Sequence, residues 1–172
     1  GNANPNFTLG WTNTFSWRNF MMTFLIDGRV GGKVLSQTRA DMDLYGVTRA
    51  TGDARDRGYV MLEGERITNV KGFYKSIVGG RAGVTEYYMY DATNFRLREF
   101  SLGYSFPKQW LESVRVLRDI HLAFTARNLF FIYRKAPFDP DLILSTGNDN
   151  QAIEVYGMPT TRGMGFSLRV TF

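Results

Sequence analysis

Residue types that commonly carry enzyme chemistry are scarce in this sequence of 172 residues, which contains no cysteine and one histidine, His121. The lack of cysteine excludes disulfide scaffolds, thiol catalysis and cysteine-based zinc sites, and one histidine excludes multi-histidine metal sites. No nucleophile–base pair can be argued around His121, which lies on the polar side of a predicted strand. The sequence therefore predicts no catalytic residue, no metal site and no cofactor, and we interpret the protein as a non-enzyme.

Two further groups of residues could suggest a ligand site. Asp139-Pro140-Asp141 and Asn148-Asp149-Asn150 carry oxygen atoms of the kind that bind Ca²⁺, but their spacing does not match an EF-hand loop and no glutamate closes it. Turn formation by Asp, Pro and Asn explains them better. Gly163-Met164-Gly165 is not a nucleotide-binding motif, because no helix is expected after it. Small residues there are better explained by the close approach of another segment.

The charge pattern does not indicate a nucleic-acid partner. Lys and Arg exceed Asp and Glu, 21 to 16, which gives a net charge of +5. The basic residues are dispersed and alternate with acidic ones, as in Arg39-Ala40-Asp41, and no nucleic-acid-binding motif is present. A solvated surface of mixed charge is the better interpretation.

The clearest pattern is the alternation of apolar and polar residues. From Phe7 to Trp17 the odd positions are apolar, except Asn13, and the even positions are polar or glycine, which is typical of a strand with two different faces. Its eleven residues match the roughly 9–11 that cross a bilayer in a tilted strand. The same period recurs later, and the sequence predicts five antiparallel strands at 7–17, 20–29, 94–106, 118–133 and 160–172.

The links between these strands alternate in length. A turn at 18–19 and a helical turn within 107–117, at Lys108 to Val114, are short, whereas the loops 30–93 and 134–158 are long. Within the first long loop we expect a helix from Ser36 to about Arg49, a polar loop over 52–58, an extended piece at 59–62 and a helical turn at 72–78. Antiparallel pairing places the short links on one side and the long ones on the other, as in bacterial outer-membrane barrels.

Membrane-spanning helices are not expected, because the longest apolar run, Phe20 to Ile26, is seven residues and a spanning helix needs roughly 18. A transmembrane β-barrel is compatible with the pattern. Aromatic residues make up 15% of the chain, and five of them are interpreted as girdles at the membrane interfaces: Trp11, Trp17, Tyr104, Phe106 and Phe172. The alternative is a soluble β-sandwich carbohydrate-binding module, which would bury its apolar face against a second sheet instead of exposing it to lipid.

Four stretches carry a family resemblance: NPNFTLGWTNTFSWRNF…FLIDGRVGGKV (4–34), YDATNFRLREFSLGYSFPKQWL (90–111), IHLAFTARNLFFIYRKAPFDPD (120–141) and GMPTTRGMGFSLRVTF (157–172). In this order and spacing they resemble the C-terminal end of SusC/RagA-type TonB-linked outer-membrane transporters of Bacteroidetes. Together they cover about half of the chain.

The resemblance implies that residues 1–172 form the C-terminal segment of a barrel of about 22 strands, with the plug and earlier strands upstream. It implies a multi-pass β-barrel in the cell outer membrane that takes up oligosaccharides or peptides. The implied partners are a SusD-like surface lipoprotein, the TonB complex, the barrel-assembly machinery and outer-membrane lipid. Loops 30–93 and 134–158 would face the substrate vestibule or the lipoprotein. The terminal Phe172 resembles the C-terminal signal that the assembly machinery recognises.

Overall fold

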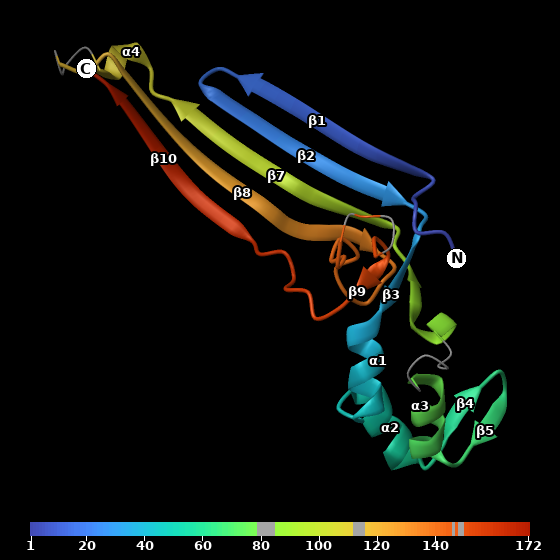
Figure 1. Cartoon of the computed structure of the whole chain (residues 1–172). Helices are drawn as coiled ribbons and strands as arrows, with labels where there is room; N and C mark the ends of the chain where they lie inside the picture. Colours follow the sequence, from blue (N-terminus) through green and yellow to red (C-terminus); the bar gives the residue numbers. More distant parts are fainter. Residues whose placement is uncertain (79–84, 112–115, 146, 148–149) are drawn as a thin grey trace. The chain divides into compact units, whose positions relative to one another are not determined.

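The computed structural model describes residues 1–78, 85–111, 116–145, 147 and 150–172, and it divides into two compact units (Figure 1). The sheet unit comprises Pro5–Gly31, Ala92–Asp139 and Pro159–Phe172. The helical unit comprises Gly1–Asn4, Gly32–Asp91 and Pro140–Met158. The two segments predicted as long loops therefore fold together as one unit.

The sheet unit contains the five predicted strands. They are β1 (Phe7–Trp17), β2 (Phe20–Val30), β7 (Asn94–Ser105), β8 (Asp119–Arg134) and β10 (Gly163–Thr171). The strands lie in the order β1-β2-β7-β8-β10, and every neighbouring pair is antiparallel. The predicted all-β class and antiparallel arrangement are confirmed, and the observed ends lie within three residues of the predicted ones.

Two local features shape this sheet. The turn between β1 and β2 consists of Arg18 and Asn19, and Arg18 adopts a positive φ of 51°, as tight hairpins require. In β7 one extra residue, Arg98, interrupts the pairing with β2, since Leu25 pairs with Glu99 while Ile26 pairs with Leu97. A bulge of this kind shifts the alternation by one residue. Arg96 and Glu99 therefore lie on the same face of the sheet.

Short elements complete the chain. The helical unit contains β3 (Lys33–Ser36), α1 (Gln37–Leu44), α2 (Arg49–Arg57), β4 (Val60–Leu62), β5 (Glu65–Ile67), α3 (Val70–Val78), η2 (Thr85–Tyr88), β6 (Met89–Asp91) and β9 (Ile153–Glu154). β3 pairs with β6 in antiparallel and with β9 in parallel orientation. The sheet unit contains α4 (Lys108–Leu111), as predicted, while residues 112–114 of that expected turn lie outside the described residues.

Helix caps explain why the predicted helix start at Ser36 is confirmed and why the predicted polar loop at 52–58 is wrong. α1 starts after Ser36, whose hydroxyl accepts from the Arg39 backbone N–H at 3.1 Å, as expected. It ends at Leu44, earlier than the predicted Arg49. The segment 52–58, expected to be a polar loop, lies largely within α2 instead. Thr48 caps the start of α2, Gly58 ends it with φ 78°, and Ala54 is buried in the core.

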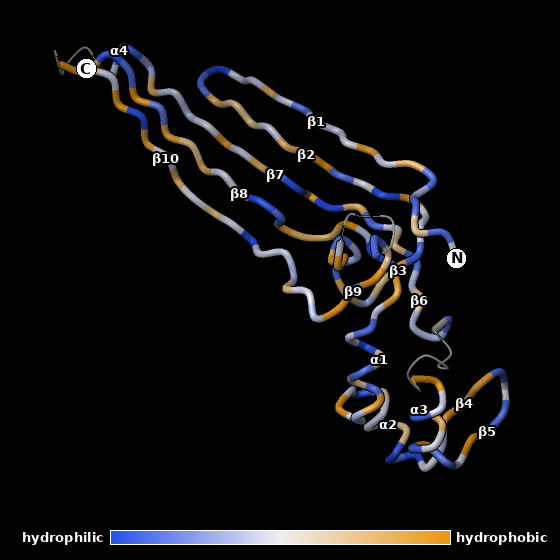
Figure 2. The backbone as a smooth tube through the Cα atoms, viewed as in Figure 1, coloured by the Kyte–Doolittle hydropathy of each residue, from blue (hydrophilic) through white to orange (hydrophobic). Residues whose placement is uncertain are grey.

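The two units bury very different side chains. The helical unit has a core of Ala40, Ala54, Val60, Phe73, Tyr74, Ile77, Val78 and Tyr88. In the described part of the sheet unit, the buried hydrophobic residues are Ala92, Leu111, Ala123, Ala126 and Ala136. Hydrophobic and hydrophilic residues instead alternate along its strands (Figure 2). None of the described helices is long and apolar enough to cross a membrane.

Candidate functional site

One face of the five-stranded sheet carries mainly apolar side chains and the other mainly polar ones, with Met21, Leu25 and Phe131 as apolar exceptions on the polar side. The register places Phe24 opposite Phe100, Leu102 opposite Phe124, and Phe124 opposite Phe166, so that apolar positions of neighbouring strands coincide. We name this side the apolar face. Its large members are Phe7, Leu9, Trp11, Phe15, Trp17, Phe20, Met22, Phe24, Ile26, Val30, Phe95, Leu97, Phe100, Leu102, Tyr104, Ile120, Leu122, Phe124, Phe130, Tyr133, Met164, Phe166, Leu168 and Val170.

Rings on the apolar face contact one another from strand to strand. The ring centroids of Trp11 and Phe24 are 5.4 Å apart, and those of Phe124 and Phe166 are 5.1 Å apart. These contacts do not bury the rings, since Trp11 remains 50% exposed and Phe166 78% exposed. Soluble monomers rarely expose so large a continuous apolar patch. The exposed face does not favour the β-sandwich alternative, which requires it to be buried.

The opposite side of the sheet is the polar face. It carries Thr8, Thr12, Thr14, Ser16, Thr23, Asp27, Arg96, Glu99, Ser101, His121, Thr125, Arg127, Ser167 and Arg169. The hydroxyls of Thr14 and Thr23 are hydrogen-bonded at 3.1 Å, and Arg127 Nε lies 3.6 Å from Glu99 Oε1. A hollow of about 440 Å³ is lined partly by these residues and by Gly163 and Gly165. The face therefore suits contact with water or with polar groups.

His121 has a packing role on the polar face. Its Nδ1 lies 3.1 Å from Ser105 Oγ, and its ring covers Gly103, where an added Cβ would be 2.9 Å from Cε1. Over the described ranges, no three His, Cys, Asp or Glu side chains are grouped so that they could hold a metal ion. Asn148 and Asp149 of the candidate Ca²⁺ loop lie outside those ranges. Asp139 of the same loop is paired with an arginine.

Four of the five aromatic residues predicted as girdles lie at one end of the sheet. Trp17 pairs with Phe20, which pairs with Tyr104, and Phe106 and Phe172 follow the ends of β7 and β10. Trp11 lies near the middle of β1 instead, opposite Ile26. Two exposed aromatic residues at this end were not singled out from the sequence: Phe20, whose ring lies 4.6 Å from Tyr104, and Trp110, 6.4 Å from Phe106. Trp110 lies in α4, where strand alternation gives no signal.

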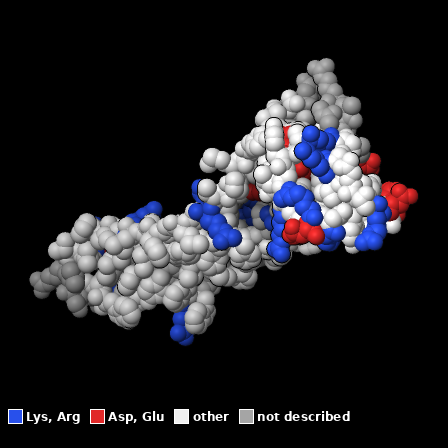
Figure 3. All heavy atoms as spheres, turned by 90° about the horizontal axis from the view of Figure 1, so that it is seen from below, with Lys and Arg blue, Asp and Glu red and all other residues white. Residues whose placement is uncertain are grey.

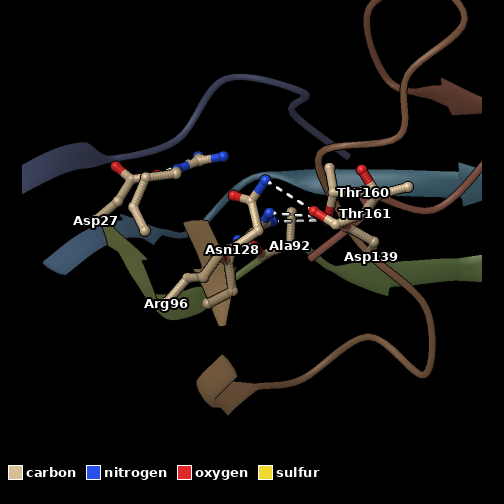
Figure 4. A network of polar contacts seen from close by, with 9 residues as sticks. Asp27, Ala92, Arg96, Asn128, Asp139, Thr160 and Thr161 are labelled. Carbon is tan, nitrogen blue, oxygen red and sulfur yellow. Dashed lines mark hydrogen bonds and ion pairs between the residues drawn. The ribbon is translucent and has the colours of Figure 1, made fainter. Parts of the chain in front are cut away.

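A buried polar cluster occupies the opposite end of the sheet (Figure 4). Arg96 is 1% exposed. Its Nη2 donates to Asp139 Oδ1 at 2.9 Å and its Nη1 to Thr160 Oγ1 at 3.1 Å, while Thr160 Oγ1 donates to Asp139 Oδ2 at 2.5 Å. The guanidinium also lies 4.3 Å from the centre of the Phe131 ring. The charge of Arg96 is thus paired with the Asp139 carboxylate away from water, and both of its Nη atoms donate hydrogen bonds.

The polar cluster links the ends of β7, β8 and β10 through side-chain hydrogen bonds. Arg96 lies on β7, Asp139 follows β8, and Thr160 precedes β10. Asn128 Nδ2 on β8 donates to the Thr161 carbonyl at 3.3 Å, and Arg98 Nε on β7 donates to Asp27 Oδ2 on β2 at 3.1 Å.

Sequence reasoning did not identify this cluster. The only local signal was the run Arg96-Leu97-Arg98-Glu99, where charged residues interrupt the start of a strand.

Comparison with known proteins supports the predicted resemblance. No protein-family model matches the chain. TonB-dependent receptor P3 of Formosa agariphila is 24% identical over 177 residues, which cover 100% of this chain and 17% of that protein. TonB-dependent receptor P39 of the same organism is 26% identical over 159 residues, which cover 90% of this chain and 14% of that protein. The chain therefore spans about a sixth of the length of the curated relatives it matches.

Solved structures give the same result for the fold. The RagAB peptide importer in its open-open state matches with a TM-score of 0.71 at 15% identity, over 99% of this chain and 17% of the matched chain. The closed-closed state of the same importer gives a TM-score of 0.68 at 14% identity, over 99% and 18%. The chain thus has the fold of a segment of the RagAB peptide importer and resembles TonB-dependent receptors in sequence along its whole length.

Proposed function

We propose that this chain is part of the wall of an outer-membrane, TonB-dependent importer that takes up oligosaccharides or peptides, and that it is not an enzyme. The observation that carries the proposal is the five-stranded antiparallel sheet with a continuous, exposed apolar face and a polar opposite face. Transmembrane barrels have this division, with the apolar side toward lipid and the polar side toward the lumen. β1 and β2 are 11 residues each, which suits a tilted strand that crosses a bilayer in roughly 9–11 residues.

Residues 1–172 would form the C-terminal segment of this barrel, with its plug and TonB-contacting part upstream. The tight turn at Arg18 and Asn19 and the link that contains α4 would lie on the periplasmic side, because short turns are typical of that side. The helical unit, built from the long connections, would lie on the extracellular side. There it would face the substrate vestibule or a SusD-like surface lipoprotein.

The aromatic residues at the end of the sheet with the short links would form the periplasmic girdle. Trp17, Tyr104, Phe106 and Phe172 would sit at the headgroup level, where amphipathic rings are favoured. Phe20 and Trp110 extend this group. Trp11, farther along β1, would contact lipid closer to the centre of the bilayer. Phe172 would also serve as the terminal signal for the barrel-assembly machinery, since it follows the alternating strand β10.

Uptake by cells tests the proposal. Three strains would be grown on a mixture of short peptides and oligosaccharides: the wild type, one without this gene, and one without the energy-coupling TonB protein. Loss of each compound from the medium would be followed by mass spectrometry. We expect at least one compound to be depleted by the wild type alone. Equal depletion by all three strains, or recovery of the full-length protein from the soluble fraction, would contradict the proposal.

A further inference from the structure

The helical unit contains a small pocket between the α1–α2 connection and α3. Its volume is about 230 Å³, which is below the roughly 300–1,000 Å³ of pockets for drug-sized ligands. One wall is apolar and consists of Leu44, Val70 and the ring of Tyr74. A ligand of this size would be a single amino-acid or monosaccharide unit with an apolar surface.

Positive charge dominates the rest of the pocket. Arg55 and Lys71 line it and are exposed to solvent, and no acidic side chain forms an ion pair with either of them in the described part of the chain. Arg55 is held in position, because its Nη1 donates to the Gly46 carbonyl oxygen at 2.8 Å. Figure 3 shows Lys and Arg side chains at the surface, with Asp and Glu side chains between some of them.

The one carboxylate that lines the pocket, Asp43, is already paired with a cation outside it. Asp43 is 3% exposed, accepts a hydrogen bond from Thr48 Oγ1 at 2.5 Å, and lies 3.5 Å from Arg39 Nε. Burial raises the pKa of Tyr74, so its phenol stays protonated and contributes no negative charge at neutral pH. The pocket therefore combines an apolar wall with two cations whose charge is not balanced within it.

We propose that this pocket binds a small organic carboxylate, with the apolar body against Leu44, Val70 and Tyr74 and the carboxylate near Lys71 and Arg55. Two kinds of molecule offer this chemistry: the C-terminal residue of a peptide, and an acidic sugar, whose C–H face can pack on a tyrosine ring. Carboxylates paired with cations form charge-assisted hydrogen bonds, which are the strongest available here. The site does not depend on the proposed transport function, because binding to the purified protein requires no membrane passage.

Binding to the full-length protein in detergent tests the site. The probes are N-acetyl-leucine, its amide, and galacturonate, and affinity is measured by calorimetry. We expect N-acetyl-leucine to bind and the amide to bind about tenfold more weakly, the size of effect expected for one charge-assisted hydrogen bond. Stronger binding of N-acetyl-leucine than of galacturonate would identify the peptide terminus as the source, and the reverse order would identify the acidic sugar.

A test variant and a matched control variant lie on the same helix, α3. Lys71→Glu removes a pocket cation, whereas Lys75→Glu changes an exposed lysine of α3 that does not line the pocket. We expect Lys71→Glu to weaken carboxylate binding at least tenfold and Lys75→Glu to leave it within twofold, since the long-range charge effect is common to both. Equal loss in the two variants, equal binding of acid and amide, or no binding of either carboxylate would overturn the proposal.

Discussion

The helical unit and the sheet unit differ in where their large apolar side chains lie: the first buries them in a core, and the second exposes many of them on one face. The helical unit packs Phe73, Tyr74 and Ile77 into a core of its own. The sheet unit leaves Phe7, Phe166 and many other large side chains of its apolar face exposed, and the hydrophobic residues that it buries are chiefly alanines. Burial of apolar surface is the main favourable term in folding. The comparison shows that the helical unit carries its stabilising contacts internally, whereas the sheet unit needs an apolar environment that it does not itself supply.

The polar cluster around Arg96 is buried within the sheet unit, so substitutions there should cause the largest loss of stability. Arg96→Met should destabilise the full-length protein by about 3–5 kcal/mol, because it leaves the Asp139 carboxylate buried without its cation. The measurement is the urea midpoint of the protein in detergent. In the control Arg127→Met, the ion pair with Glu99 is exposed, and the loss should be at most about 1 kcal/mol.

A double variant sharpens this result. Replacing both partners, Arg96→Met with Asp139→Leu, should recover much of the stability, because no buried charge then lacks a partner. A double variant that is less stable than either single variant would mean that the cluster does not act as a coupled ion pair.

Because the helical unit has a core of its own and the apolar face of the sheet does not, a Phe→Ala substitution should lower the stability by different amounts in the two units. Phe73→Ala should cost about 3–5 kcal/mol, because the helical unit cannot fill the cavity. Hydrogen exchange of the α3 amides would measure this loss. If the apolar face contacts lipid as proposed, Phe166→Ala should cost less, about 1.5–3 kcal/mol, because lipid would then occupy the vacated space. Refolding into vesicles would measure the second value. A larger cost at Phe166 would argue that another protein segment covers it.

The next largest loss of stability is expected from placing a charge on the apolar face of β10. Leu168 lies on the apolar face and Ser167 on the polar face. Leu168→Arg should cost about 2–4 kcal/mol if the residue faces lipid near the centre of the bilayer, whereas Ser167→Arg should have little effect. Folding yield in vesicles and resistance to heat in gel electrophoresis would report both. Equal sensitivity at the two positions would refute the assignment of the faces.

Phe172 has the smallest expected effect on stability but a distinct effect on assembly. Its side chain is 70% exposed, so deletion removes few contacts within the chain, and the loss of interfacial burial should be at most about 1.5–3 kcal/mol. If Phe172 is an assembly signal, deletion should sharply lower the amount of heat-modifiable protein in the outer membrane while the inserted molecules still transport. Unchanged amounts in the membrane would leave Phe172 as a girdle residue only.

Strand alternation is a local property, and for that reason the sequence alone predicted the sheet well. The side chains of one strand point alternately to two faces whatever the strand pairs with, so residues 7–17 and 163–171 could be recognised with their apolar sides. Ser36 could be recognised as a helix cap for the same reason, since its hydroxyl binds a backbone N–H three residues away. Trp17 lies beside the tight turn between β1 and β2, so its place at this end of the sheet is also local, whereas Tyr104 reaches the same end through the long-range pairing of β2 with β7.

The remaining features depend on contacts between distant residues, and only the tertiary structure decided them. Arg96 and Asp139 are 43 positions apart, and Ser36 and Glu154, which share a hydrogen bond of 2.6 Å, are 118 apart. α2 contains few apolar residues and is defined by its caps and by the burial of Ala54. The parallel pairing of β3 with β9 joins the two segments predicted as separate loops. Such contacts arise only when the whole chain is folded, because no local pattern specifies which distant residue a buried charge or a short strand will meet.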